Sequence, residues 1–326
     1  MGAQDFQLMV GDESTWNTPV TPTRTFEYES ENIEESYGRT EGAPLRRGTA
    51  FPRNDRFTPY LAGAAGSIQL AVMSKGFGFF LKHMMGSVAT TGPAETTVYT
   101  HTGTEGTLLG KGITAQVNRP FHPAGTDQPF TYAGGKITEW TLSNSVEGNL
   151  LLDLGLDFAS VATATALATA SYPTGMDPLT WVGGTVTIGG TQVDLDEFSL
   201  SVKNGNNVDR RKIRGNAEKK EQTQGKREGT FSLKCDFESL TQRNRAAATS
   251  RSGALAAIVA TWQGPTLLGS SIYPTFQVTL SAGRFDDWKA ATTDYDGIQQ
   301  ELSGVVTWDG TNSPVQVVYK SADTTP

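Results

Sequence analysis

The sequence contains little cysteine and little histidine. Among its 326 residues are one Cys, at position 235, and three His. A single thiol excludes an internal disulfide and favours synthesis in a reducing cytoplasm. His83, His101 and His122 match no metal-binding spacing, so we expect neither a metal nor another cofactor.

Long apolar runs are also missing. No stretch approaches the roughly 18 residues that a membrane-spanning helix needs. The N-terminal residues MGAQDFQLMVGDEST lack the basic and apolar regions of a secretory signal. We therefore expect no membrane insertion and no secretion.

Recognisable catalytic motifs are absent as well. The sequence has no Gly-x-Ser-x-Gly elbow, no Walker loop and no dinucleotide fingerprint. Asp194 and Asp196 stand two residues apart, but the Gly and the terminal Glu of a calcium loop are missing. Nothing in the sequence supports an enzyme.

Glycine, proline, serine and threonine are abundant, and hydrophobic residues make up 37% of the chain. This composition favours many short strands joined by turns over a helical bundle. The length is sufficient for two domains that each bury a core. We predict a mainly β protein.

The second half of the sequence repeats the element order of the first half. Each half reads as a strand, a long basic loop, a second strand, a short helix and further strands. These elements fall at 26–37, 38–62, 66–72 and 76–86, and again at 195–202, 203–228, 229–237 and 238–250. The helix at 76–86 carries an apolar stripe with helical spacing.

The repeat predicts two tandem β-sandwich or β-barrel units, each with a short flanking helix and a long basic loop. We place the first unit, with an N-terminal arm, at 1–165 and the second at 166–326. Small residues followed by Pro and Gly make about 159–177 the linker. In the preferred register the hairpin at 130–158 corresponds to 297–323; a rival register pairs EWTLS (139–143) with EFSLS (197–201).

Charge is segregated between the loops and the rest of the chain. The loop at 38–62 has a balance of +3 and that at 203–228 a balance of +5, which leaves −15 elsewhere from the total of −7. Basic arms on an acidic body favour contacts between copies of the chain, although both loops could simply be solvated. Candidate contact residues are Arg39, Arg46, Arg47, Arg53, Arg56, Arg210, Arg211, Lys212 and Arg214.

Two predicted strands show clear alternation. In NLLLDLGLDF, ending at 158, leucines occupy one face and Asp153 and Asp157 the other, so we expect an acidic face directed away from the core. The two Cα atoms would be about 13 Å apart, too far for a retaining glycosidase pair. In TFSLKCDF, Cys235 lies on the apolar face, which predicts a buried structural thiol.

Several phrases together resemble the major tail tube proteins of long, non-contractile-tailed (siphovirus-type) bacteriophages. They are TWNTPVTPTR, SIQLAVMSKGFGFFLKHMMGSV, PFTYAGGKITEWTLS, FSLSVKNGNNVDRR and VVYKSADTTP. The resemblance implies a structural virion protein, made in the host bacterial cytoplasm, that polymerises into stacked rings. In this family the inner sheets of neighbours join into a β-barrel, and the stacked rings form a hollow conduit for genome delivery.

The resemblance also implies partners. They are further copies of the chain, other tail proteins (tape measure, tail terminator, distal tail) and double-stranded DNA that passes without specific binding. Family rings are commonly hexamers of single units, so two units per chain predict a trimer with pseudo-six-fold symmetry, with a hexamer as the alternative. Asp153 and Asp157 are candidates for an acidic lumen lining, because such a lining does not attract phosphates.

Two other classes of function are open on sequence alone. One is a two-domain β-sandwich binding module, such as a tail-associated or surface adhesin for glycans. It would need exposed aromatics clustered on one face, whereas the six Trp are scattered among the predicted strands. The other is a hydrolase with an unrecognised site.

Overall fold

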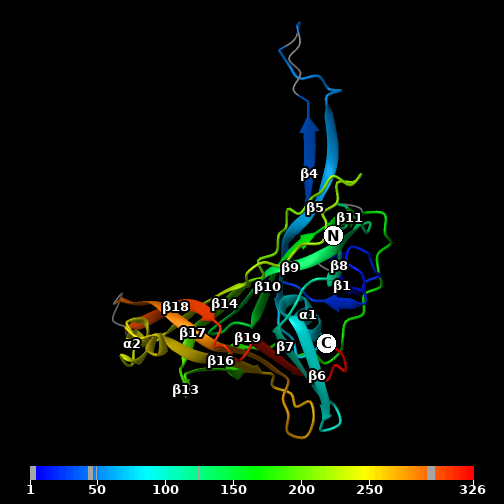
Figure 1. Cartoon of the computed structure of the whole chain (residues 1–326). Coiled ribbons are helices and arrows are strands. Elements are labelled where there is room, and N and C mark those ends of the chain that lie inside the picture. Colours follow the sequence, from blue (N-terminus) through cyan, green and yellow to red (C-terminus); the bar gives the residue numbers. More distant parts are fainter. Residues whose placement is uncertain (1–4, 43–46, 49, 123–124, 292–297) are drawn as a thin grey trace.

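The computed structural model describes residues 5–42, 47–48, 50–122, 125–291 and 298–326. These residues form a mainly β protein in which antiparallel pairing connects 19 strands. The predicted fold class is confirmed at this level. Figure 1 shows a body, a long hairpin that projects from it and a wing that contains β14 to β18.

The first half of the chain supplies eleven strands and one helix. They are β1 (Gln7–Glu13), β2 (Arg24–Phe26), β3 (Ser30–Glu31), β4 (Glu34–Glu41), β5 (Phe57–Ala71), α1 (Gly78–Met85), β6 (Gly86–Ala94), β7 (Val98–Glu105), β8 (Gly112–Asn118), β9 (Pro129–Ser145), β10 (Leu151–Phe158) and β11 (Ser160–Ala162). The strand β1 pairs with both β8 and β2, so the apolar run near the N-terminus is part of the sheet.

The second half supplies the remaining elements. They are a 3-10 turn (Trp181–Gly183), β12 (Gly184–Ile188), β13 (Thr191–Gln192), β14 (Leu195–Lys203), β15 (Glu228–Asp236), α2 (Thr241–Ala246), α3 (Arg251–Ala254), β16 (Leu255–Gln263), β17 (Thr275–Ala291), β18 (Gln299–Thr307) and β19 (Val315–Ser321). The stretch predicted as one helix at 238–250 contains α2 and ends where α3 begins.

Eight strands form what we call the main band. They pair in the order β4, β5, β10, β9, β14, β15, β18 and β17. The strand β9 is central because it takes part in two layers. Its first part pairs with β8 and β11, and its second part pairs with β10 and β14. The change occurs next to Gly134, whose φ of +66° suits glycine.

The order of pairing is the same in the two halves. The first half contains the series β5, β10, β9, β8, β1, and the second half contains β15, β18, β17, β16, β12. The short strand that follows β10, β11, pairs with the first part of β9. In the same way β19, which follows β18, pairs with the first part of β17.

The core lies on one face of the main band. Alternation in β10 and β15 buries Leu152, Leu154, Leu233 and Cys235, as the sequence patterns predicted. Burial raises the pKa of the Cys235 thiol to about 11, so the thiol stays protonated and inert. The helix α1 buries its apolar stripe beneath the sheet and ends at Gly86, with φ of +93°.

Removing a core side chain from the shared strand β9 should destabilise the whole protein. Leu142 is fully buried and its strand pairs with both β10 and β14. We expect Leu142→Ala to lower the free energy of unfolding by about 2–5 kcal/mol in urea denaturation, because the site cannot collapse completely. The neighbouring Ser143→Ala, on the opposite face, should change it by less than about 0.5 kcal/mol. Equal losses would contradict this assignment of the core face.

Candidate assembly surfaces

The face of the main band opposite the core is polar. Strand alternation places carboxylates on it from several strands, interspersed with fewer ammonium groups. The acidic residues are Glu34, Glu139, Asp153, Glu197, Glu228, Asp236, Asp287 and Glu301, and the basic residues are Lys203, Lys234 and Lys289. Ser143, Ser199 and Ser232 line a hollow on this face. The surface is therefore net acidic and rich in hydroxyl groups.

Asp153 and Asp157 have different environments. Asp153 is partly exposed on the polar face, between Gln69 and Thr141 on the neighbouring strands. Burial and the nearby Glu139 raise its pKa. Asp157 is only 4% exposed and is covered by the segment that follows β14. The expectation that both lie on an exposed acidic face is thus wrong for Asp157.

The covering segment, residues 204–227, is the second of the two basic loops, and we call it the strap. It leaves the second half of the chain and lies against the first half. The Lys219 Nζ and the Gln222 Nε2 both donate hydrogen bonds to the Asp157 carboxylate, and both side chains are buried. Burial raises the pKa of Asp157, and Lys219 opposes that shift.

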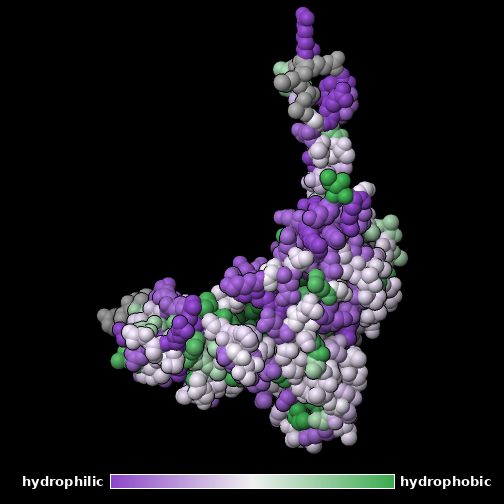
Figure 2. Space-filling model, viewed as in Figure 1, coloured by the Kyte–Doolittle hydropathy of each residue, from purple (hydrophilic) through white to green (hydrophobic). Residues whose placement is uncertain are grey.

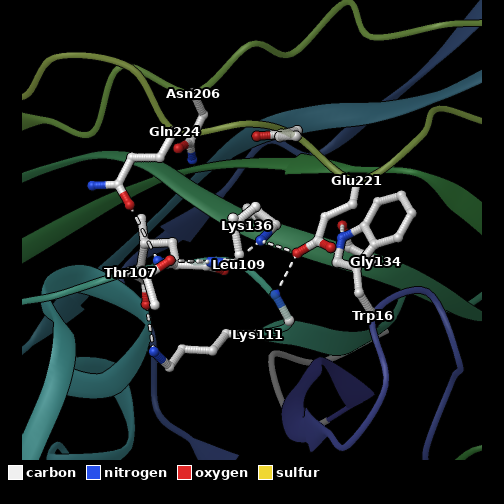
Figure 3. Close-up of polar contacts among 12 residues, drawn as sticks. Trp16, Thr107, Leu109, Lys111, Gly134, Lys136, Asn206, Glu221 and Gln224 are labelled. Atoms are coloured by element: carbon white, nitrogen blue, oxygen red, sulfur yellow. Dashed lines mark hydrogen bonds and ion pairs between the residues drawn. The ribbon is translucent and has the colours of Figure 1, made fainter.

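A second ion pair, between a buried lysine and a partly buried glutamate, holds the strap. The Lys136 Nζ lies 2.8 Å from Glu221 Oε1 and also donates to the Leu108 carbonyl (Figure 3). Glu221 accepts a further hydrogen bond from the Gly110 N–H, and Gln224 accepts one from the Leu108 N–H. Burial lowers the pKa of Lys136, whereas Glu221 raises it. The strap is therefore tied to the first half by several desolvated polar contacts.

The predicted contact residues of the first loop lie on the projecting hairpin, which we call the arm (residues 37–61). The described part of the arm and its base has a mostly hydrophilic surface (Figure 2). The Arg39 guanidinium lies 5.7 Å from the centre of the Phe57 ring, and Arg53 pairs with Asp55 at 2.6 Å. Arg56 lies 3.9 Å from Asp55 and Arg47 is exposed. Arg46 lies outside the described residues.

The predicted contact residues of the strap mostly bind their own chain. Arg210 donates to the Glu221 carbonyl at 2.6 Å, and Arg214 donates to the Lys219 carbonyl at 3.0 Å. Arg211 donates to the Ala62 carbonyl at the base of the arm. Lys212 is exposed next to Ile213, which is fully exposed. The structure thus brings the tip of the strap to the base of the arm.

Sequence reasoning missed the buried polar residues that hold the strap. The buried Lys136, Lys219 and Gln222 belong to this group, together with the partly buried Glu221. A weak signal was available, because Lys136 interrupts an otherwise apolar strand in AGGKITEW. A buried lysine requires an anionic partner. The sequence gives no indication of which distant carboxylate that is.

Comparison with known proteins identifies the family. A family model described as phage tail tube protein matches residues 3–304. The chain belongs to the phage tail tube protein family. It is therefore a structural component of the virion tail and not an enzyme. No curated protein matches the sequence.

This tail tube protein shows neither a metal cluster nor a membrane helix in its described parts. Among those residues, no three His, Cys, Asp or Glu side chains gather in a way that would hold a metal ion. In the same part of the chain, no helix has both the length and the apolar character needed to cross a bilayer.

The attachment of the strap to the first half should depend on the buried ion pair of Lys219 and Asp157. We expect Lys219→Met to lower the free energy of unfolding by about 3–5 kcal/mol, because the Asp157 carboxylate loses its counter-ion while it stays buried. The double variant Lys219→Met/Asp157→Leu should regain most of that loss. The control Lys226→Met removes an exposed strap lysine and should change stability by less than about 0.5 kcal/mol. Urea denaturation of the unpolymerised protein measures all three.

The loss of unfolding free energy in Lys219→Met should also depend on pH. Without Lys219 the pKa of Asp157 rises further above its unfolded value, so the protonated form favours the folded state. The deficit of Lys219→Met should therefore be largest at neutral pH and shrink as the pH falls towards 5. A deficit that is absent, or that grows on acidification, would argue against a buried ion pair.

Proposed function

We propose that the chain consists of two tail-tube units and forms trimeric rings with pseudo-six-fold symmetry. The rings stack into the tube of a long, non-contractile, siphovirus-type tail. Each chain supplies two of six quasi-equivalent positions, divided near residues 159–177 into units 1–165 and 166–326. The observation that carries this proposal is the repeated order of strand pairing in the two halves.

Irregularities in the sheet support the equivalence of the halves. Between β8 and β9 the pairing jumps from Ile113 to Ala115 as the partner changes from Gly135 to Tyr132. Between β16 and β17 it jumps from Ala256 to Ile258 as the partner changes from Gly283 to Leu280. The two jumps coincide when β8 is equated with β16 and β9 with β17.

A further irregularity follows the same rule. A bulge separates Gly155 from Leu156 in the pairing of β10 with β9, and another separates Phe285 from Asp287 in the pairing of β17 with β18. The resulting alignment sets GGKITEW (134–140) against AGRFDDW (282–288). In this register the hairpin at 130–158 corresponds to 278–306, so neither register favoured by the sequence patterns is retained.

The two units are joined edge to edge. Residues 139–145 of β9 pair with residues 197–203 of β14. Lys203 lies 3.9 Å from Glu139 across this join, and the Thr141 hydroxyl donates to the Ser201 hydroxyl at 3.2 Å. Repeating such a join around an axis closes a barrel and removes the open strand edges that otherwise cause aggregation.

The polar face of the main band is the proposed lumen lining. It carries Asp153 and the other carboxylates listed above, and acidic groups repel the phosphates of passing duplex DNA. Partners are thus other copies of the chain, the tape measure, tail terminator and distal tail proteins, and DNA without specific binding. The arm, with Arg39, Arg53 and Arg56, extends away from the body and is the better placed of the two basic loops to reach a neighbour.

The number of chains per ring tests the duplication. We expect cryo-EM averaging of isolated tubes to show three chains per ring, each contributing two similar but distinguishable units, and three arms per ring. Native mass measurement of released rings should give a multiple of three chains. Six chains per ring, each contributing a single inner sheet, would overturn the proposal.

The charge of the lining gives a second test. We expect tubes of Glu139→Lys/Asp153→Lys/Glu301→Lys to retain duplex DNA at low salt and to release it as salt is raised, because phosphate–lysine contacts release counter-ions. Wild-type tubes should not retain DNA. A control with the same change of charge, Glu27→Lys/Glu105→Lys/Glu238→Lys, alters exposed residues outside the polar face. If the control retains as much DNA as the first variant, the polar face does not line the bore.

A further inference from the structure

Two strand edges of the main band have no strand partner in the described part of the chain. One is the outer edge of β3 and β4, which pair only with β5. The other is the side of β17 opposite β18, beyond the last residue that pairs with β16, Arg284, where β17 has contacts with the short helices α2 and α3 but no strand partner among the described residues. These edges lie at the two ends of the band. An open edge is a template for pairing with another chain.

The internal join provides a template for pairing these edges. Residues 30–35 correspond to 197–202 of β14, because both segments pair with equivalent positions of β5 and β15. Ile33 then corresponds to Leu200, and both side chains are fully buried. Residues 287–290 of β17 correspond to 139–142 of β9, which are paired with β14. Each open edge therefore has a paired counterpart within the same chain.

We propose that residues 33–36 of one copy pair with residues 287–290 of the next copy, in the register of the internal join. This inference rests on the ring proposed above and identifies the joint that closes it. In this register Ile33 is opposite Ala290, Glu34 is opposite Lys289 and Glu35 is opposite Trp288. The joint is the intermolecular counterpart of the contact between β9 and β14.

Charge complementarity supports this register. Glu34 and Lys289 are both exposed in the single chain. They occupy the positions of Ser201 and Thr141, whose hydroxyls are hydrogen-bonded across the internal join. Opposite charges directly across an antiparallel pair stabilise it, and like charges destabilise it. An ion pair between copies thus replaces a hydroxyl pair within the chain.

The backbone of the free edge is directed correctly for the joint. The Asn32 N–H donates to the Ser67 carbonyl of β5, so the backbone groups of the next residue, Ile33, point outward. In the single chain they are satisfied by side chains. The Glu31 carboxylate accepts from the Ile33 N–H at 3.1 Å, and Arg119 donates to the Ile33 carbonyl at 2.7 Å. When the joint forms, a backbone hydrogen bond to the next copy replaces the contact between Glu31 and the Ile33 N–H. Before that, the Glu31 and Arg119 side chains protect the edge from pairing with other chains.

Cysteine cross-linking tests the joint. At the two ends of β14 the backbone groups of Asp196 and Asn204 form hydrogen bonds with β9. Every second residue of an antiparallel strand bonds to the same neighbour, and Ser201 is an odd number of residues from both. Ser201 and Thr141 therefore form a non-hydrogen-bonded pair. The pair of Glu34 and Lys289 has the same geometry, with Cα atoms about 4.5 Å apart, within the range that a disulfide spans. We expect Glu34→Cys/Lys289→Cys to form covalent oligomers on oxidation of assembled tubes, and either single variant to form none.

Matched variants test which residues lie opposite each other across the joint. Thr141→Cys/Ser201→Cys should form its disulfide within one chain, which shows that the geometry is competent. Glu34→Cys/Asp287→Cys shifts the pair by two residues along the same face and should give less than about a tenth of the cross-linking, because the diagonal distance is about 7–8 Å. Cys235 is buried and is retained in all variants. Cross-linking that is stronger in the shifted pair would overturn the register.

Charge exchange gives a readout that does not depend on disulfide formation. Glu34→Lys and Lys289→Glu should each raise the critical concentration for tube growth about three- to tenfold, and the double exchange should restore it to within about twofold. If the double variant is no better than either single variant, the two residues do not meet. Wild-type protein that forms no tubes would refute the ring itself, whereas normal tubes without the cross-link would refute only the joint.

Discussion

Two strand pairings, β9 with β14 and β7 with β19, fix the relation between the two halves. The strand β9 binds the layer that contains β8 and β1 with its first part, and with its second part it lies between β10 and β14. The strands of the second half that extend the main band, from β14 to β17, are joined to the first half along the β14 edge. Backbone pairing fixes distance and register together, so a side chain such as Leu142 serves the core of both halves.

The strap gives this contact its specificity. Backbone edges can pair with many partners, but the ion pairs of the buried Lys219 with Asp157 and of the buried Lys136 with Glu221 are satisfied in only one arrangement. Desolvating charges contributes little net stability, whereas a misplaced strap would leave two buried charges unpaired. The arm occupies the corresponding place in the proposed first unit, and the ion pairs of its described residues, Arg53 and Arg56 with Asp55, lie within the arm itself. If the two units are equivalent as proposed, the same loop forms an internal contact in the second unit and is directed outward in the first.

The sequence predicted those features of the fold that depend on local residue patterns. Alternation in TFSLKCDF and NLLLDLGLDF assigned the core faces, the stripe in GFGFFLKHMMG predicted α1, and the hairpin at 130–158 is present as β9 and β10. It did not predict the burial of Asp157, because alternation gives the face of a residue but not what covers it, and Lys219 is 62 residues away. The proposed register between the halves was not found from the sequence, because element order alone does not fix it; it rests on the positions of the bulges in β9 and β17, which hydropathy does not show.

Carrying the β9–β14 contact within one polypeptide changes the thermodynamics of building a closed ring. In the proposed ring, every second joint forms when the chain folds, at the effective concentration of a tethered pair. Only the alternate joints require free molecules to meet and lose translational and rotational freedom. Three chains need two association steps to form a ring, whereas six single units need five, so the ring of paired units loses less association entropy and has fewer incomplete intermediates. The wall of the proposed tube then has six similar units per ring but only three-fold symmetry, which six identical single units would not give.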